Sequence, residues 1–509
     1  MEHMKHRNYT RRGFLLSAGL AAGLAAATAM TGRSSSFAGN TERKSNRKPN
    51  FIIFLTDDQG YNDVGCFGSP KIKTPNFDRM AREGMMLTSY YVGSPVCGPS
   101  RAALMTGCYP LRIAEPQNKK NLHTIPHTKE IMLPEVLRQA GYATGLIGKW
   151  HLAGGLNKDG NYPWHLMPNG QGFDYFYGTP LHNGLTPTVT SKAFQVQNIR
   201  NDKVLVDRLD QKGMDNLTGD YTKEAIQFIT EHKDDPFFLY LAHNMPHVPL
   251  GASKAFRGKS KGGLYGDVIE ELDWSMGRVL ETLKKLGLDE DTFVVFTSDN
   301  GPWIEAYLKG YYGCADPLRG SKMKSWEGGP RVPCIMRWPG SIPAGRICDE
   351  IATTMDIFPT FAALAGASLP KDRVIDGKDI FPLISGKTNR SPHDEYFFYC
   401  YTHLHGVRSE RWKLVLPRPA KPGWMSWWAR MIDEVKEIQL FDLKNDIGET
   451  TNVAQKHPEI VKRLMELIEN ARQEIGDCDR IGKGARFFDP EPKRPDIRKY
   501  NSWLAKHNK

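Results

Sequence analysis

The sequence predicts an α/β fold, in which helices sandwich a large mixed, mostly parallel sheet, followed by a smaller C-terminal α+β domain with an antiparallel sheet. Three observations lead to this prediction. The chain has 509 residues, enough for one large core and a second, smaller one. Short apolar runs rich in β-branched and aromatic residues alternate with helical stretches, as in parallel sheets. After Ser385–Pro392 the runs become short and closely spaced, as in antiparallel sheets.

The predicted large domain, residues 50–390, is built on buried strands with helices between them. A helix is expected over Pro75–Glu83, because Thr74 is a typical helix start and Gly84 a typical stop. A longer helix is expected over Asp267–Leu286, where apolar residues recur on one face before a glycine. Four apolar runs have the length of buried strands: Phe51–Leu55, Tyr142–Ile147, Phe237–Leu241 and Phe293–Thr297.

The predicted C-terminal domain, residues 391–482, combines one helix over Pro458–Ile475 with four short strands. Residues 483–509 are rich in proline, lysine and arginine, which indicates an extended tail. The four strands are expected at Tyr396–Tyr401, Gly406–Arg408, Trp412–Leu416 and Gln439–Leu443.

The N-terminus has the features of an export signal. Adjacent Arg11 and Arg12 precede an apolar, alanine-rich stretch, and Ser36-Phe37-Ala38 offers a small-x-small cleavage site. Residues 1–38 therefore resemble a twin-arginine signal peptide, and residues 39–49 a polar linker. A single membrane anchor with basic flanks is the alternative. We expect an exported bacterial protein, periplasmic or extracellular, that uses the twin-arginine translocase.

Composition excludes several classes of protein. The formal net charge is +11, but more than half of it lies before Asn50, and no basic stripe indicates nucleic-acid binding. No apolar run after the N-terminal segment is long enough to cross a membrane. The eight cysteines show no C-x-x-C spacing, so a structural zinc site is not expected.

Acidic residues follow two of the predicted strands, at the strand ends where α/β sheets bind ligands. Asp57 and Asp58 come after the first strand, and Asp299 and Asn300 come after the last. Each pair alone is better explained by an ordinary turn than by a metal site. Adjacent carboxylates repel each other unless a cation lies between them. Together the four residues form an all-oxygen ligand set, which indicates a hard cation, Ca²⁺ rather than Mg²⁺.

Cys97 lies at the start of a further predicted helix. Pro99 is typical of an early helix position, so Cys97 lies where backbone N–H groups favour an anion. Arg101, on the first turn, can reach the same anion or a nucleophile at residue 97. Two other interpretations stay open: an ordinary capped helix with a buried cysteine, and a thiolate nucleophile of lowered pKa.

Lysine and histidine follow the remaining predicted strands. Lys149 and His151 come after the second strand and point the same way if its alternation continues. His243 and His247 come after the third strand, and Lys322 lies in a later glycine-rich segment. Any one of them is more often a surface or satisfied core residue. Together, beside a cation site, they predict a pocket for a small tetrahedral oxyanion.

These motifs resemble the type I, formylglycine-dependent sulfatases of the alkaline phosphatase superfamily, in particular the arylsulfatase A and N-acetylgalactosamine-6-sulfatase group. Cys97–Gly107 matches the signature C-x-P-S-R…T-G, whose cysteine is oxidised to formylglycine, and Gly141–His151 matches the second signature. An ordered set over nearly the whole chain after Pro49 is far more specific than any one motif. The match continues through Asp57–Gly60, His247, Asp299–Gly301, Lys322, Trp326–Pro333, Leu440–Leu443 and Glu449–Asn452.

The resemblance implies a sulfuric ester hydrolase with a formylglycine-hydrate nucleophile and a Ca²⁺-assisted covalent sulfate intermediate. Arg101 and Lys149 would steady the formylglycine. His247 and Lys322 would bind the sulfate and assist the leaving group. His151 would take a proton in the second step. The implied Ca²⁺ ligands are Asp57, Asp58, Asp299, Asn300 and the modified Cys97, and His182 is a looser match to a sulfate contact.

The same resemblance implies a sulfated carbohydrate or aryl sulfate as substrate, and a formylglycine-generating enzyme that acts before export. Cys108 departs from the family pattern, which has a basic residue there, and this bears on recognition by the modifying enzyme. Two other functions stay open: a phosphonate or phosphate monoester hydrolase on the same scaffold, and an inactive sulfated-glycan-binding protein. Trp424, Trp427 and Trp428 suit sugar stacking, domain packing or contact with a membrane surface.

Overall fold

The structure is a computed structural model that describes residues 47–113, 126–154, 160–183, 196–304, 312–420 and 432–486. The chain divides into two units, Met1–Glu42 and Arg43–Lys509, and the described residues all belong to the second. The predicted signal segment, most of the predicted linker and tail, and Trp424, Trp427 and Trp428 lie outside the described residues. None of the described helices combines the length and apolar character that a membrane crossing needs.

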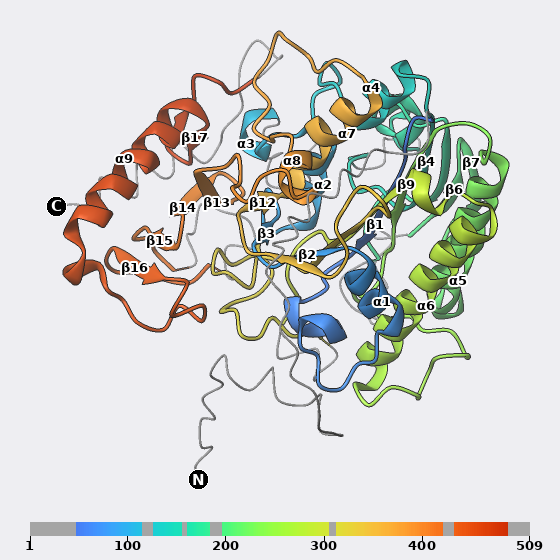
Figure 1. Ribbon diagram of the computed structural model, residues 1–509, viewed down its shortest axis with the longest axis horizontal. Coiled ribbons are helices and arrows are strands. Elements are labelled where there is room, and N and C mark those ends of the chain that lie inside the picture. Colours follow the sequence, from blue (N-terminus) through green and yellow to red (C-terminus); the bar gives the residue numbers. More distant parts are fainter. Residues whose placement is uncertain are drawn as a thin grey trace, which may run out of the picture. The chain divides into compact units, whose positions relative to one another are not determined.

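A large sheet of ten described strands is the central feature (Figure 1). The strands are β1 (Asn50–Thr56), β2 (Met85–Leu87), β4 (Ala143–Lys149), β5 (Tyr175–Thr179), β6 (Asn198–Arg200), β7 (Lys203–Val206), β8 (Phe237–Ala242), β9 (Thr292–Ser298), β10 (Cys334–Arg337) and β11 (Arg346–Cys348). Their order is β11-β2-β10-β9-β1-β8-β4-β5-β6-β7. The five middle strands, β9 to β5, run parallel to one another, and antiparallel pairs occur only further out. This confirms the predicted large, mixed and mostly parallel sheet.

Helices cover both faces of this sheet. They are α1 (Pro75–Glu83), α2 (Cys97–Thr106), α3 (Pro110–Ile113), α4 (Leu133–Gln139), α5 (Gln211–Glu231), α6 (Gly263–Lys285), α7 (Ile357–Ala365) and α8 (Phe381–Ile384). Ile52 and Phe54 of β1 join α1, α5 and α6 in one hydrophobic cluster, whereas Phe51, Ile53 and Leu55 join α2, α4 and α7 in another. Figure 1 shows α5 and α6 side by side. Because both faces are covered, the middle strands have continuous apolar sequences.

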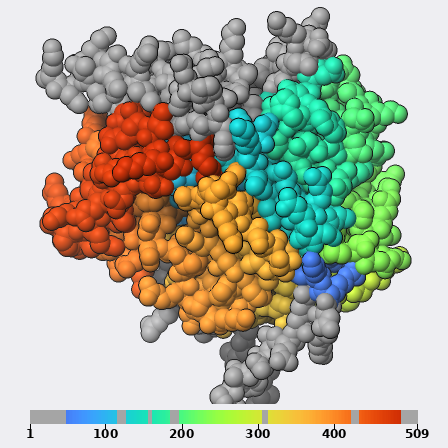
Figure 2. All heavy atoms as spheres, turned by 90° about the horizontal axis from the view of Figure 1, so that it is seen from above, coloured from blue at the N-terminus to red at the C-terminus, as the bar shows by residue number. Residues whose placement is uncertain are grey.

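The C-terminal residues form a second, antiparallel sheet in the order β13 (Glu395–Cys400), β14 (His403–Ser409), β15 (Trp412–Val415) and β16 (Gln439–Asp442). Helix α9 (Pro458–Glu474) packs on it through Leu464 and Ile468, which share a cluster with Val407 and Leu414. In Figure 2 the red residues, which include α9, and the green residues, which include α5 and α6, lie on opposite sides. Two short pairs complete the described strands: β3 (Tyr90–Tyr91) with β12 (Ala352–Thr353), and β17 (Gly476–Asp477) with β18 (Arg480–Ile481).

Candidate active site

The predicted site residues gather at the edge where the five parallel strands end. Because parallel strands have their carboxyl ends at one edge, the topology alone brings the residues after each strand together. Asp57 and Asp58 follow β1, Asp299 and Asn300 follow β9, His247 lies in the loop after β8, Lys149 ends β4 and is followed by His151, and His182 follows β5.

Backbone hydrogen bonds hold the two acidic loops against each other. The N–H of Asp299 donates to Thr56 O at 3.1 Å, and the N–H of Asp58 donates to Asp299 Oδ1 at 3.2 Å. The N–H of Asp57 donates to Met245 O at 3.1 Å, which ties in the loop after β8. Asp58 has a left-handed backbone (φ 64°), a conformation that aspartate adopts more readily than most residues.

Arg101 and Lys149 pair with two of the buried carboxylates. Lys149 Nζ donates to Asp57 Oδ2. Arg101 Nε donates to Asp299 Oδ2 at 2.9 Å, and its Nη1 donates to Lys149 O at 2.8 Å. Arg101 Nη2 lies 3.8 Å from Asp57 Oδ2. All four side chains are at most 1% exposed, so these charges depend on one another for compensation.

Asp58 faces a second set of polar groups. Its Oδ1 accepts hydrogen bonds from Lys322 Nζ at 2.6 Å and from Asn300 Nδ2 at 2.7 Å. His247 Nε2 lies 3.7 Å from Asp58 Oδ2. Lys322 comes from a loop far along the chain from the strand ends, and the fold brings its ammonium to the same edge.

Burial acts to raise the pKa values of Asp57 and Asp299, whereas pairing with cationic side chains acts to lower them. Burial acts to raise the pKa of Asp57, but Lys149, His247 and Arg101 outweigh it and hold that pKa below its ordinary value. The pKa of Asp299 is raised, first by burial and then by the charge of Asp57. Two carboxylates that repel each other this closely form a site that a cation would stabilise.

Three buried oxygen atoms at this edge of the sheet show whether the residues present fit Ca²⁺. Asp57 Oδ1, Asp58 Oδ2 and Asn300 Oδ1 are buried and have no hydrogen-bond partner among the described residues. Buried polar atoms in that state are costly, and a cation would satisfy all three. Ligand atoms of Asp57, Cys97 and Asp299 also lie within 4.8 Å of one another. An oxygen-rich set of this kind fits Ca²⁺.

Cys97 is the first residue of α2 and is 6% exposed. Burial raises the pKa of its thiol above the ordinary value, although Lys149 and Lys322 oppose this. A nucleophilic thiol has a lowered pKa, so the direction of this shift counts against the thiolate interpretation. The unmodified thiol of Cys97 therefore has the wrong acidity for a nucleophile.

Three histidines line one side of the cluster. The ring centroids of His151 and His182 lie 5.3 Å apart, and those of His182 and His247 lie 5.7 Å apart. The expected strand alternation from Lys149 to His151 is wrong, because β4 ends at Lys149 and His151 has a left-handed backbone (φ 68°). A turn, and not the pleat of a strand, places His151.

Comparison with protein families identifies the chain. The family model Sulfatase matches residues 49–367, and the model N-sulphoglucosamine sulphohydrolase, C-terminal, matches residues 321–474. The chain belongs to the sulfatase family. This confirms the predicted resemblance and the predicted class of enzyme, a sulfuric ester hydrolase.

Curated relatives of this sulfatase agree with that assignment. N-acetylgalactosamine-6-sulfatase of Rattus norvegicus is 38% identical over 435 residues, which cover 81% of this chain and 78% of the relative. Steryl-sulfatase of Homo sapiens is 38% identical over 434 residues, which cover 71% of this chain and 74% of the relative.

Solved structures share the fold. PsFucS1 sulfatase from Pseudoalteromonas sp. has a TM-score of 0.72 at 27% identity, covering 83% of this chain and 90% of that one. A structure described under metabolism of multiple glycosaminoglycans by Bacteroides thetaiotaomicron has a TM-score of 0.71 at 30% identity, covering 84% of this chain and 99% of that one.

Of the two histidines that follow β8 in this sulfatase, His243 does not join the site. His243 is fully buried beside Phe54, with ring centroids 4.7 Å apart, and its Nε2 lies 3.3 Å from Ser275 Oγ. Burial lowers the pKa of His243 to about 3, so the ring is neutral. His243 is a buried core residue, whereas His247 four residues later reaches the site.

Two asparagines that sequence reasoning missed position the histidines of the sulfatase. Asn244 Nδ2 donates to Asn183 Oδ1 at 2.6 Å and to Thr179 Oγ1 at 2.8 Å, and Tyr221 OH donates to Asn244 Oδ1 at 2.9 Å. Asn183 Nδ2 donates to His247 O at 3.3 Å. The loops after β5 and β8 are therefore locked together. Asn244 directly follows His243 in the chain, but only its contacts reveal this role.

Proposed function

We propose that this sulfatase removes sulfate from a sulfated carbohydrate, with residue 97 as nucleophile after oxidation of Cys97 to formylglycine. The observation that carries the proposal is the position of Cys97, at a helix start, within 4.8 Å of the ligand atoms of Asp57 and Asp299. Related structures support a carbohydrate substrate, since Ps i-CgsB, at 29% identity and a TM-score of 0.67, was solved with k-i-k-neocarrahexaose.

Asp57, Asp58, Asp299 and Asn300 would hold Ca²⁺ together with an oxygen of modified residue 97. When bound, Ca²⁺ supplies positive charge that favours an ionised hydroxyl nucleophile and stabilises charge on sulfuryl oxygens. The hydrate of formylglycine supplies one hydroxyl to attack sulfur and a second through which sulfate is later released. Lys149 and Arg101 hold Asp57 and Asp299 in place, so the carboxylates keep their spacing during the reaction.

Lys322 and His247 are assigned to the sulfate and the leaving oxygen. The ammonium of Lys322 neutralises charge that develops on these oxygens in a buried site. His247 Nδ1 lies 2.5 Å from Val248 O, which only accepts, so Nδ1 carries a proton and Nε2 faces the site. Burial lowers the pKa of His247, and an anionic sulfate beside Nε2 would favour its protonated, donating form. His151 is assigned to removal of the proton that precedes sulfate release, and His182 to sulfate contact.

The decisive experiment examines residue 97. The peptide that contains Cys97 should show the mass of an aldehyde in place of the thiol and react with a hydrazide probe. Aryl sulfate turnover should follow the aldehyde fraction across preparations and vanish in Cys97→Ala. Full turnover by protein whose Cys97 can be alkylated completely would overturn the assignment.

A second experiment concerns the substrate. Defined sulfated oligosaccharides should release sulfate faster than an aryl phosphate releases phosphate, and sugars that differ only in sulfate position should separate clearly. Preference for the aryl phosphate would instead favour the phosphonate or phosphate monoester hydrolase.

We also propose that a formylglycine-generating enzyme modifies the chain before the twin-arginine translocase exports it. The adjacent Arg11 and Arg12 support this order, because that route carries folded proteins. Replacing both arginines by lysine should leave modified, active enzyme in the cytoplasm of the producing bacterium. Unchanged export of that variant would contradict the proposed route.

A further inference from the structure

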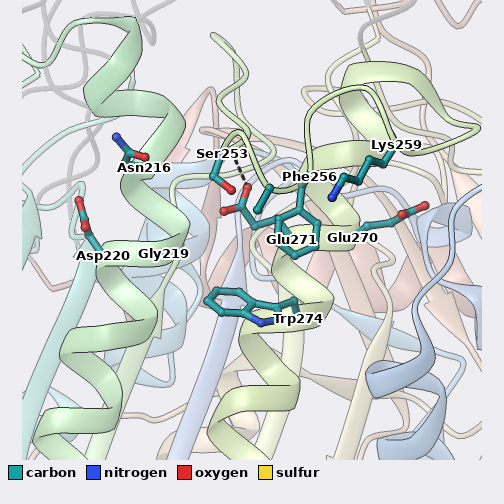
Figure 3. A pocket seen from close by; sticks show the side chains of 10 residues that line it. Asn216, Gly219, Asp220, Ser253, Phe256, Lys259, Glu270, Glu271 and Trp274 are labelled. Atoms are coloured by element: carbon teal, nitrogen blue, oxygen red, sulfur yellow. Dashed lines mark hydrogen bonds between the residues drawn. The ribbon is translucent and has the colours of Figure 1, made fainter.

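A separate cavity of about 510 Å³ lies between α5, α6 and the loop at 252–262 that precedes α6 (Figure 3). None of the residues that line it belongs to the site described above. Its volume is in the range of small-molecule pockets, about 300–1,000 Å³. Two aromatic rings, one glycine and several polar side chains line the cavity.

Two aromatic rings form the apolar part of the cavity. Trp274, on α6, is 37% exposed, unusually high for so large an apolar side chain. The ring centroid of Phe256 lies 5.9 Å from that of Trp274, and the rings are inclined by 53°. Figure 3 shows the indole across the bottom of the cavity with Phe256 above it. An exposed indole face is a platform for the apolar face of a sugar ring.

Gly219 leaves one wall open. It lies in the interior of α5, more than two turns from either end, where glycine destabilises a helix relative to alanine. A Cβ atom at Gly219 would meet no heavy atom within 4 Å, so packing does not explain the glycine. Gly219 and Trp274 both line the cavity, and the missing side chain at Gly219 keeps space free beside the indole.

The charged groups select against a sulfated ligand. Three acidic side chains, Asp220, Glu270 and Glu271, line the cavity together with one lysine, Lys259. Glu271 Oε2 accepts from the N–H of Ser253 at 2.8 Å, and burial raises the pKa of both Glu271 and Asp220. A sulfate ester here would add repulsion in a partly desolvated cavity. Hydroxyl groups, which both donate and accept, suit this mixture of carboxylates and an ammonium.

A short loop joins the cavity to the edge of the large sheet where the predicted site residues gather. The loop after β8 carries His247 near its start and Ser253 further along, six residues later. Six residues span at most about 22 Å, so the cavity wall and the catalytic histidine lie within reach of one oligosaccharide.

We propose that this cavity binds a neutral, unsulfated sugar unit, stacked on Trp274 and admitted by the open wall at Gly219. The proposal rests on the proposed function only in that the protein acts on carbohydrate. One polymer chain would present a sulfated unit to residue 97 and an unsulfated unit to the cavity.

The test uses the full-length protein and saturation-transfer NMR. The probes are unsulfated galactose, N-acetylgalactosamine, glucose and fucose, each compared with its sulfate ester. At least one unsulfated sugar should give a signal that is lost in Gly219→Leu, which fills the open wall with a good helix former. Trp274→Ala should lose the same signal. Lys223→Leu, an exposed change on α5 outside the cavity, is the matched control and should keep it.

Aryl sulfate turnover separates this proposal from the proposed function. All three variants should turn over an aryl sulfate at the wild-type rate, which also shows that they fold. A signal that persists in Gly219→Leu would place the sugar elsewhere and overturn the proposal, as would the absence of any signal from the four unsulfated sugars. Binding by the sulfate esters but not by the unsulfated sugars would overturn it too, and failure to hydrolyse sulfated carbohydrate would overturn only the proposed function.

Discussion

Replacing Lys413 by methionine should destabilise the protein far more than the loss of an ordinary ion pair. Lys413 Nζ lies 3.1 Å from Glu327 Oε1 and 2.7 Å from Glu449 Oε1, and all three side chains are fully buried. Removing one partner of a buried charged group costs about 3–5 kcal/mol. Glu327 keeps Arg331 at 3.1 Å, and Glu449 can take a proton, so the lower end, about 3 kcal/mol, is expected.

The pKa directions support that value. Burial acts to raise the pKa of Glu327, but Lys413 and Arg331 outweigh it and bring it to about 2. Burial, followed by the charge of Glu327, raises the pKa of Glu449 to about 7 even with Lys413 present. Because the pKa of Glu449 is raised in the folded protein, the folded protein loses stability as the pH rises from 4.5, the ordinary pKa of glutamate, to about 7. Lys413→Met should therefore be least harmful below about pH 6.

Urea unfolding followed by tryptophan fluorescence measures the change. The double variant Lys413→Met/Glu449→Gln should recover about 1–2 kcal/mol, since the new amide carries no charge and its oxygen can still accept from the N–H of Glu327. Lys436→Met, whose ion pair with Glu434 is exposed, should change nothing measurable. A loss below about 1 kcal/mol in Lys413→Met, or no recovery in the double variant, would refute the reasoning.

Three further outcomes are expected. Gly301→Ala should lower kcat for an aryl sulfate by about 10²-fold. The Cβ of the new alanine would lie 1.9 Å from Gly328 O and displace the adjacent Asp299–Asn300 turn, so a wild-type kcat would contradict this reasoning. Dialysis against a chelator should abolish turnover and lower the melting temperature, and Ca²⁺ should restore both; activity in metal-free protein counts against the ligand set. His393 is half-buried, and its Nε2 lies 2.6 Å from Asp356 Oδ1. Although its partial burial acts to lower the pKa of His393, Asp356 raises it above the ordinary 6.5. Its contribution to stability is present below pH 6.5 and lost as pH rises through the raised value, so His393→Gln should matter more at about pH 5.5 than at about pH 8.5 in thermal melts.

The middle of the sheet could be predicted because burial on both faces leaves a direct trace in sequence. Phe51–Leu55 is apolar at every position, and the structure extends that strand by one residue at each end. Helix α1 is confirmed over Pro75–Glu83, where a proline start and a glycine stop act locally. Helix α6 begins at Gly263, four residues before the predicted start, because its first turn lacks a local start signal.

Elements at the edge of the fold were missed for the opposite reason. Helix α5 was not predicted, since its buried residues are interrupted by polar ones and by Gly213 and Gly219. The outer strand β7, Lys203–Val206, was not predicted either, because its apolar run of three residues, all exposed in the structure, is too short to indicate a strand. Both depend on tertiary contacts that a local pattern does not record.

The candidate site was likewise predicted only in part. Strand ends predicted which acidic and basic residues would meet, because topology brings them to one edge whatever the details of each loop. The pairing within the site could not be predicted: that Lys149 faces Asp57 while Lys322 faces Asp58 depends on turns such as the left-handed Asp58. His243 shows the limit most clearly, since it and His247 are both buried and only their contacts differ: His243 packs on Phe54, whereas His247 lies beside Asp58.

The C-terminal motif around Glu449 connects these levels. From sequence it was only a matched family segment, with no chemistry of its own to indicate a role. In the structure, Glu449 Oε2 accepts from the N–H of Glu327, in the same loop that carries Lys322. Lys413, on β15, ties that loop to the antiparallel sheet through Glu327 and Ser325 O at 3.0 Å. The C-terminal sheet therefore acts on the reaction indirectly, by holding the loop that places Lys322 beside Asp58, and Lys413→Met should lower kcat as well as stability.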